Sequence, residues 1–540
     1  MARTVNNEPS AKTSEEPDVA VVGLGPVGIT LCHLLAQRGV HVLGLDRAAG
    51  IYGLPRATGL DQEVMRVFQG LGITDELAPY LSDYRSSEYR SADGKVLRRF
   101  VSLPQPYPLA WPPYMTFVQP DVERVLRESS ARYPNLTLAL STELVSLRDS
   151  EAPVLEVRDL TNNTCEEVRP RFVVGCDGGN SFVRRTLGIE FEDLVFDEPW
   201  IVVDVFVEDD AVELPEVNVQ YCNPQRPHTF IVAPGRLRRW EFKVLPGEDP
   251  AEVNKRDRIW QLLSPWLRPD QGRIWRSAAY NFHALVARQW RSRQVLLAGD
   301  ACHMTPPFLA QGMVQGIKDV SNLAWKLGLV LDGTDDQLLD SYEAERRPLV
   351  RDVIAVTKDL GNLICELDPE RARQRNDRML AMMEAGQGTS VRQELFPPIR
   401  HGIIGFLPDG TPSGGAGRPC PQPWVLNSTG RHRLDDILPS EFNLLIRDGF
   451  ELSEDAVDAA ASLALGVMTI APNDVLAADV REEATVFSDW LRVHDANAIL
   501  VRPDHIVFGT AADCKALIAL LSQLRSLLHG EYQVRHSLLS

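Results

Sequence analysis

Residues 295–327 read VLLAGDACHMTPPFLAQGMVQGIKDVSNLAWKL, and this stretch decides the fold class. Its first four residues, Val295–Ala298, form an apolar run that is typical of a buried strand. The strand leads into Gly299-Asp300, then a Pro306-Pro307 kink, and then an amphipathic helix that begins near Gly312. This order aims one carboxylate and a row of backbone N–H groups at a single bound molecule.

A second pattern that binds phosphate lies near the start of the chain. Asp18–Gly23 is a short β-branched run, and Gly23-Leu24-Gly25-Pro26-Val27-Gly28 fits GxGxxG. Pro26–Arg38 has the apolar spacing of a helix, and Val40–Asp46 follows as a strand that ends in an acid. The glycines permit close approach of a pyrophosphate, and Asp46 is placed to accept a ribose hydroxyl. We therefore predict a βαβ dinucleotide-binding unit.

Segments far apart in the sequence thus point at one cofactor. Arg171–Cys176 is a further buried strand, and it ends at Asp177-Gly178. Asp300 suits the ribityl hydroxyls of a flavin, and the helix N-terminus at Gly312 would stabilise negative charge on the pyrimidine edge of a reduced flavin. A long cofactor held from both ends of the sequence is FAD.

The composition limits the partners. With 44% hydrophobic and 24% charged residues among 540, the chain has the make-up of a globular protein. Its 56 Lys and Arg against 74 Asp and Glu give a net charge of −18, which argues against nucleic acid and anionic membranes. Eight cysteines without CxxC or zinc-finger spacing predict no metal, no disulfide and a cytoplasmic location. No apolar run is long enough for a membrane span, and a homodimer is left open.

The order of the motifs resembles one known family. GxGxxG, then the Asp-Gly segment, then Gly-Asp followed by PPF, QGM and NLAWKL is similar to the single-component (class A) flavoprotein aromatic hydroxylases over residues 18–350. The segments WIVVDV, NPQRP and RRWEFKVLPGE are similar to the group that includes 3-(3-hydroxyphenyl)propionate and phenol hydroxylases. That group carries a C-terminal thioredoxin-like domain. The extension here has no CxxC, so the resemblance implies packing or oligomer contacts for it and not redox work.

The expected fold is α/β and has three parts: a Rossmann-like FAD-binding domain, an inserted antiparallel β-sheet substrate domain of the p-hydroxybenzoate hydroxylase type, and a C-terminal thioredoxin-like α/β domain. The expected boundaries are a disordered arm at 1–17; the FAD-binding domain at 18–85, 114–195 and 288–345; the substrate domain at 86–113 and 196–287; a helical segment at 346–400; a Gly- and Pro-rich linker at 401–423; and the thioredoxin-like domain at 424–540.

The resemblance also implies which residues bind FAD. Val314 stands where the family often has Asn, so a side-chain bond is lost there while backbone contacts remain. Asp46 stands where the family often has Glu, which shortens the reach to the ribose. By position in the motifs, the FAD-binding residues are Gly23, Gly25, Gly28, Asp46, Arg47, Arg56, Gln119, Asp177, Asp300, Pro307, Gly312, Met313 and Val314.

The reaction that the family implies is hydroxylation of a phenol. NADH or NADPH reduces the flavin as a transient visitor, because the sequence has no second GxGxxG. O2 then gives a C4a-hydroperoxyflavin, which transfers oxygen to the ring position ortho or para to the hydroxyl. The predicted substrate is a phenolic acid like 3-(3-hydroxyphenyl)propionate. Two alternatives stay open: a hydroxylase of a larger polyketide or polycyclic product, and a flavin-binding ligand carrier without turnover.

Activation of a phenol calls for a group that takes or shares its proton. The catalytic candidates are Tyr221, His228 and His283 in the β-rich segment, Arg56 in LPRATG, and His303 nearer the flavin. Phe308 and Met313 are candidates for the cavity wall. A substrate carboxylate would need a cation, for which the candidates are Arg226, Arg236, Arg238 and Arg239. The last three alternate with apolar residues in GRLRRWEF, a pattern that indicates a solvated strand face.

Overall fold

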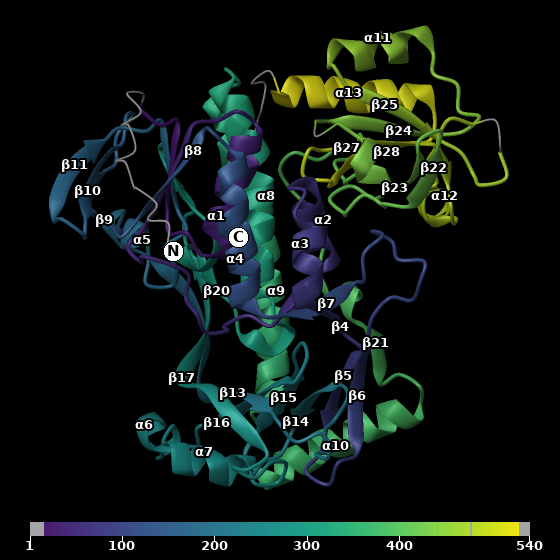
Figure 1. Ribbon diagram of the computed structural model, residues 1–540. Coiled ribbons are helices and arrows are strands. Elements are labelled where there is room, and N and C mark those ends of the chain that lie inside the picture. Colours follow the sequence, from purple (N-terminus) through teal and green to yellow (C-terminus); the bar gives the residue numbers. More distant parts are fainter. Residues whose placement is uncertain (1–15, 440, 476–477, 529–540) are drawn as a thin grey trace, which may run out of the picture.

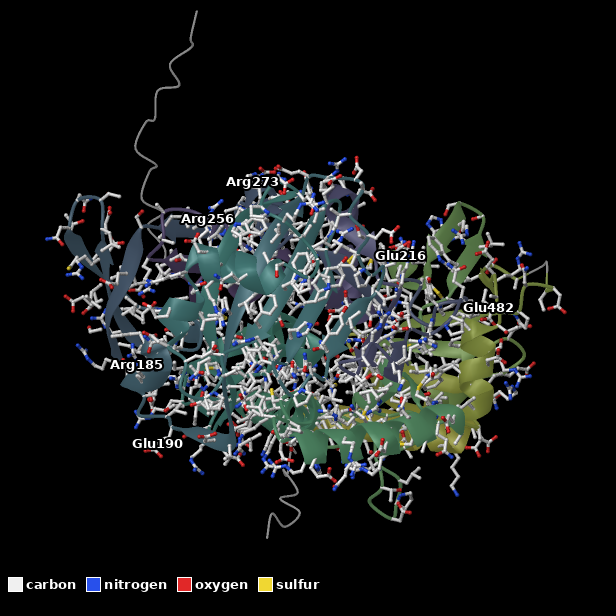
Figure 2. The ribbon with its side chains drawn as sticks, turned by 90° about the horizontal axis from the view of Figure 1, so that it is seen from below. Arg185, Glu190, Glu216, Arg256, Arg273 and Glu482 are labelled. Carbon is white, nitrogen blue, oxygen red and sulfur yellow. The ribbon has the colours of Figure 1, made fainter. Side chains whose placement is uncertain are left out.

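The computed structural model describes residues 16–439, 441–475 and 478–528, so nearly all of the predicted N-terminal arm lies outside the described residues. Figure 1 shows an α/β domain, a large β-sheet layer below it, and a second α/β domain to one side. In Figure 2, Arg256 and Arg273 mark the sheet layer, and Glu482 marks the C-terminal domain at the opposite end of the molecule from Arg185. Among the described helices, none is long and apolar enough to cross a membrane.

The FAD-binding domain has a six-stranded sheet of order β18-β19-β12-β1-β2-β8, which is parallel except at β18. Its central strands are buried on both faces, which explains their unbroken apolar sequences. The strands come from both sides of the inserted layer, as the discontinuous Rossmann-like prediction requires. Their bounds are β1 Val19–Val22, β2 Val42–Asp46, β8 Leu136–Leu140, β12 Phe172–Gly175, β18 Arg291–Ser292 and β19 Val295–Leu297.

The helices of this domain place the predicted motifs at one edge of the sheet. They are α1 Pro26–Gln37, α2 Gln62–Gly70, α3 Thr74–Leu77, α4 Gln119–Ser129, α5 Phe182–Thr186 and α8 Gly312–Leu331. Short 3-10 turns, η3 Gly299–Ala301 and η4 Pro307–Leu309, lie between β19 and α8. Two three-stranded sheets complete the domain: β3 Gly59–Asp61, β7 Tyr114–Phe117 and β4 Leu81–Asp83; and β9 Thr142–Arg148, β10 Val154–Asp159 and β11 Thr164–Val168.

The substrate layer is a nine-stranded, mainly antiparallel sheet of order β20-β17-β13-β16-β15-β14-β5-β6-β21. Its strands are β5 Ser86–Arg90, β6 Val96–Val101, β13 Phe191–Val207, β14 Asn218–Tyr221, β15 His228–Val232, β16 Leu237–Lys243, β17 Gly272–Ala287, β20 His303–Met304 and β21 Thr389–Val391. The outer face packs apolar side chains on α6 (Pro250–Val253) and α7 (Arg256–Leu263). The other face turns toward the FAD-binding domain (Figure 1).

The predicted helical segment at 346–400 is two helices and an edge strand. α9 spans Asp340–Ile364, and α10 spans Pro369–Glu384. The break falls at Asp368, which caps α10 through Arg371 N, with Pro369 in the first helical position. Asp-Pro starts a helix well but does not continue one, so the chain turns there.

The C-terminal domain has a four-stranded sheet of order β25-β24-β27-β28, with β24 and β25 parallel and the other pairs antiparallel. Its elements follow one another as β-α-β-α-β-β-α, which is the predicted thioredoxin-like topology. They are β24 Asn443–Arg447, α11 Glu454–Ser462, β25 Gly466–Ile470, α12 Val486–Val493, β27 Ala498–Val501, β28 Val507–Ala511 and α13 Cys514–Leu528. A small sheet of β22 Trp424–Asn427, β23 Gly430–Arg433 and β26 Arg481–Glu482 lies beside it.

The predicted linker at 401–423 is packed between two domains. Gly405 N donates to Phe508 O at 2.6 Å, and Gly417 N donates to Val507 O at 2.9 Å. Fully buried ion pairs then join α8 and α9 to the C-terminal domain, with Glu345 3.0 Å from Lys326 and 2.8 Å from Arg502. Burial opposes the charge of Glu345, but the two cations bring its pKa to about 2. These contacts fix the C-terminal domain against the flavin helix.

Candidate active site

The glycine loop after β1 has the shape that GxGxxG predicts. Gly23 has φ +93°, and a Cβ on Gly28 would lie 1.9 Å from Gly23 O, so both positions need glycine. A Cβ on Gly25 would meet nothing within 4 Å, so this side of the loop is open. Among the described residues no side chain caps α1, whose first amides therefore face that opening. The opening fits a pyrophosphate at a helix N-terminus.

Asp46 ends β2 beside this loop. Its Oδ2 accepts from Leu24 N at 2.9 Å, and its Oδ1 accepts from Ala48 N at 2.9 Å. Arg127 on α4 donates to Leu24 O at 2.6 Å and lies 3.6 Å from the Asp46 carboxylate. The buried Nε of Arg127 has no partner among the described residues, so a donor is left for a bound oxygen. Sequence reasoning missed Arg127, because a lone helical arginine carries no motif. Arg47 is exposed beyond the strand end.

Gln119 connects α4 to the segment that carries Arg56. Its Oε1 accepts from Arg56 N at 3.2 Å and from Ala57 N at 2.6 Å, while its Nε2 donates to Glu123 at 2.6 Å. The Arg56 side chain lies over Tyr52, 4.6 Å from the ring centre. Burial raises the pKa values of Glu123 and Asp300, and the charge of Arg56 lowers both. Arg56 therefore lies between two predicted parts of the cofactor site.

The Gly299-Asp300 turn is held from below by a buried carboxylate. Asp319 on α8 accepts from Gly299 N at 3.2 Å, from His303 Nε2 at 2.7 Å and from Arg346 Nε at 2.9 Å. Although burial opposes its charge, His303 and Arg346 keep the pKa of Asp319 below its usual value. Asp300 is exposed to solvent, although the protein around it is dense enough to raise its pKa. A carboxylate that faces a ligand site would have both properties. His303 therefore helps to hold the Gly299-Asp300 turn through its hydrogen bond to Asp319.

The start of α8 meets the start of α1. A Cβ on Gly316 would lie 2.6 Å from a methyl group of Val27, so the two helix N-termini approach closely. Pro307 lies in η4, and Ala310 follows with φ +48°, which turns the chain into Gly312. The Val314 side chain is fully buried, which leaves only its backbone for a ligand. Two positive helix ends and Asp300 fit one long, anionic cofactor.

Asp177 has a structural role in addition to the predicted one. Its Oδ2 accepts from Phe182 N at 2.6 Å and from Val183 N at 3.1 Å, which caps the start of α5. Its Oδ1 is buried and has no partner among the described residues. The Asp177 backbone also backs Gly23, since a Cβ on Gly23 would lie 2.7 Å from Asp177 Cα.

The face of the substrate sheet that is turned toward this site carries buried charged side chains, Asp204, Arg239 and Arg276, and we call this face the floor. Asp204 on β13 is fully buried and lies 2.8 Å from Arg239 on β16 and 3.5 Å from Arg276 on β17. Both arginines donate to the carbonyl oxygen of Pro55, and Arg239 also donates to Arg56 O at 2.6 Å. The floor thus grips the segment that carries Arg56. The prediction of a solvated face was wrong for Arg239, which is only 4% exposed because the FAD-binding domain covers that face.

Glu241 lies on the same face, two residues beyond Arg239. It is 5% exposed, and among the described residues no donor lies within hydrogen-bonding reach of its carboxylate. Burial raises its pKa to about 7, against the lowering effect of Arg239. Tyr89 on β5 is next to Gln220 in the sheet, and its buried hydroxyl also has no described partner. Sequence reasoning missed both groups.

An aromatic cluster connects the floor to the flavin loop. Trp200 stacks on Phe282, with ring centres 5.8 Å apart, and Phe308 of η4 meets both rings edge-on at 5.8 and 6.1 Å. Phe308 therefore joins the wall of the region between sheet and cofactor groove. Met313 packs against the adjoining core.

Three of the predicted proton-relay residues, Tyr221, His228 and His283, lie on the other face of the sheet. Tyr221 and His228 stack on each other at 4.3 Å and contact Trp266 beyond α7. Burial lowers the pKa of His228 to about 4. His283 lies 3.6 Å from Asp197 and has the opposite orientation to Phe282, its neighbour in β17. These three side chains therefore point away from the face that carries Asp204, Arg239 and Glu241, whereas the Arg56 backbone contacts that face through Arg239.

The candidate arginines of the substrate segment also have partners. Arg226 pairs with Glu248 at 2.6 Å, and Arg236 pairs with Asp210 at 2.7 Å. Arg238 donates to the carbonyl oxygens of the turn before it. Lys243, on the floor beside Glu241, pairs with Glu198.

Comparisons with known proteins agree with this geometry. The FAD binding domain model matches residues 16–357, and the HcaD C-terminal domain model matches residues 417–526. A Rhodococcus jostii protein named "Probable NADH-specific resorcinol 4-hydroxylase" is 34% identical over 524 residues, 96% of each chain. The Escherichia coli 3-(3-hydroxy-phenyl)propionate/3-hydroxycinnamic acid hydroxylase is 30% identical over 522 residues, 91% of each chain. The structure of the flavin-dependent monooxygenase PieE covers 96% of this chain and 99% of its own, with TM-score 0.79 and 23% identity, and shows the shared fold.

Proposed function

The chain belongs to the FAD-dependent aromatic hydroxylases of class A, and we propose that within this family it hydroxylates a small, neutral phenol with a second ring hydroxyl, such as resorcinol. The chain is an FAD-binding monooxygenase that uses a nicotinamide cofactor and O2. Two relatives named as hydroxylases leave no support for the carrier alternative.

The observation that carries the proposal is the unpartnered carboxyl group on the floor. Two floor cations already have an acid, since Arg239 pairs with Asp204 and Lys243 pairs with Glu198. Arg276 lies 3.5 Å from Asp204 and keeps its buried Nε and Nη2 without a described partner. A substrate carboxylate on this floor would meet the Glu241 carboxylate, and the approach of like charges is costly. A neutral diphenol instead offers hydroxyl groups that can donate to Glu241.

Glu241 is also suited to activate the ring. Bound FAD would supply the redox chemistry by which one atom of O2 is transferred, with reducing equivalents from the nicotinamide cofactor. Glu241 takes the phenol proton: the O–H bond of the phenol breaks, an O–H bond forms on the carboxylate, and negative charge moves into the ring. Phenols have pKa values of about 10, so a buried base with a raised pKa is better matched to the transfer than an exposed carboxylate. The wall of Trp200, Phe282 and Phe308 keeps water from this side of the ring.

A phenolic acid is the second candidate, and Arg56 favours it. Arg56 has no carboxylate partner among the described residues. Burial and then the cations Arg239 and Arg56 lower the pKa of Arg276, which places Arg56 close to the floor as well as to Asp300. The carboxylate of a compound like 3-(3-hydroxyphenyl)propionate would bind Arg56, with its ring on the floor.

The test is oxidation of NADH and NADPH by the FAD-loaded enzyme across a panel of phenols. We expect resorcinol-like diphenols to give the highest kcat/KM, NADH to be preferred, and the product to gain one oxygen atom by mass spectrometry. A phenolic acid with higher kcat/KM than every neutral diphenol would reverse the order of the two candidates. Turnover only with large polycyclic phenols would reject both.

A further inference from the structure

A cavity of about 310 Å³ lies where the FAD-binding domain meets the C-terminal domain. We call it the seam cavity. One side is formed by α2 and the middle of α8, and the other by residues 417–421, Trp490 and residues 504–506. Its walls include Leu109, Tyr114, Phe396 and several prolines. The wall also carries charged side chains, among them Lys318, Arg418 and Asp504. A small cavity that combines apolar walls with polar groups is the usual form of a small-molecule site.

Two polar groups in the wall lack the hydrogen-bond partners that burial requires. The Oε1 atoms of Gln62 and Gln393 are buried and have no hydrogen-bond partner within the described chain. Gln62 is 8% exposed and Arg392 is 4% exposed. The Arg392 guanidinium donates to Leu309 O and lies 4.1 Å from the Tyr114 ring centre, but no described carboxylate pairs with it. Two buried acceptors therefore lack a donor in the described chain, and the Arg392 cation lacks an acid.

The walls are held in place independently of any ligand. Arg66 pairs with Asp435 and donates to Cys420 O, which joins α2 to the C-terminal domain. Lys318 on α8 lies 2.8 Å from Asp61 at the start of α2. The buried pairs of Glu345 close the far side of the same seam. These contacts hold the two domains together around the seam cavity. Its unpartnered groups therefore do not result from poor packing between the domains.

We propose that the seam cavity is a second binding site for a hydroxylated aromatic compound. The ring lies between the apolar walls, its hydroxyl groups donate to Gln62 and Gln393, and one of its oxygens accepts from Arg392. The inference rests on the proposed function for the identity of the phenol. Arg392 donates to the carbonyl oxygen of Leu309, in the turn that leads into α8. A phenol bound to Arg392 is therefore connected to the flavin site through this hydrogen bond.

The test compares two readouts on the FAD-loaded, oxidised enzyme with resorcinol as the probe. Flavin absorbance reports occupancy of the catalytic site, and isothermal titration calorimetry reports all bound phenol. We expect more phenol bound than the flavin change accounts for. Q393L and S321L, of which the second fills the cavity from α8, should each weaken the additional binding by about tenfold while the flavin response stays. Q374L, on the exposed side of α10, is the matched control.

The outcomes separate this inference from the proposed substrate. Binding that matches the flavin response alone, or additional binding that Q393L and S321L leave intact, overturns the seam site. Absence of any flavin response to resorcinol counts against the proposed substrate. If resorcinol then still binds, and Q393L removes that binding, the seam site stands without it. Retained FAD and an unchanged circular dichroism spectrum exclude misfolding of either variant.

Discussion

The cofactor groove and the sheet floor face each other, but they are built from different parts of the chain. The groove consists largely of backbone: a glycine loop, two helix N-termini and the Gly299-Asp300 turn. The floor consists of side chains that alternate along strands, with Asp204, Arg239 and Glu241 at its centre. Backbone sites tolerate few residue types at each position, whereas a strand accepts many. A single substitution in the groove should therefore abolish FAD binding, whereas substitutions in the floor should lower stability and turnover in smaller steps.

G28A should have the largest effect. An added methyl group would lie 1.9 Å from Gly23 O, which forces the loop and α1 apart. We expect the variant to purify without FAD and with a strongly lowered Tm. G50A is the control, because a Cβ there meets nothing within 4 Å. An FAD-loaded, yellow G28A protein would show that the loop is less constrained than its geometry indicates.

R239M should destabilise the floor and then the groove. It leaves Asp204 buried with only Arg276 nearby, and removal of one member of a buried pair costs about 3–5 kcal/mol. Chemical denaturation would measure this loss, and weakened FAD binding would report release of the Pro55–Arg56 segment. R236M removes an exposed pair with Asp210 and should cost less than about 1 kcal/mol. Equal losses in the two variants would contradict the buried floor.

The same contrast explains how far the sequence could be interpreted. GxGxxG, Asp46 and Gly299-Asp300 predicted the groove because their spacing reflects backbone geometry. RRWEF showed the alternation of a strand correctly, but periodicity does not tell which face a distant domain covers. The isolated Asp204 within WIVVDVFV was the available signal, since an acid in a buried strand needs a partner. Tyr221 and His228 were predicted by residue type alone, and strand parity puts them on the outer face.

Stability should fall with rising pH because of Glu241. Its pKa in the folded protein is about 7, above the ordinary value of 4.5, so the protonated form favours folding. This contribution is complete below pH 4.5 and is lost as the pH rises through 7, and it amounts to about 3 kcal/mol at most. Denaturation of wild type and E241Q between pH 5 and 8 measures it. A wild-type profile parallel to that of E241Q would show that Glu241 is not desolvated.

E241Q should also lower turnover. Gln cannot take the phenol proton, and loss of a general base reduces rate by about a hundredfold or more. In wild type, log kcat/KM for a neutral diphenol should rise with pH to a plateau above about 7, as Glu241 ionises. That limb should be absent in E241Q, while E213Q, at an exposed acid, should keep it. A shifted KM with an intact pH limb would make Glu241 a binding group and not the base.

R56M should give the smallest effect, and it separates the two candidate substrates. If a carboxylate binds Arg56, the variant should raise KM for a phenolic acid relative to a neutral diphenol by about tenfold, near the cost of one charge-assisted hydrogen bond. FAD content must be measured in parallel, because Arg56 also lies beside Asp300. An unchanged ratio would mean that Arg56 does not bind the carboxylate of an acid. The preference would then be set on the floor, where Glu241 disfavours an acid and the Nε and Nη2 of Arg276, which have no described partner, favour one.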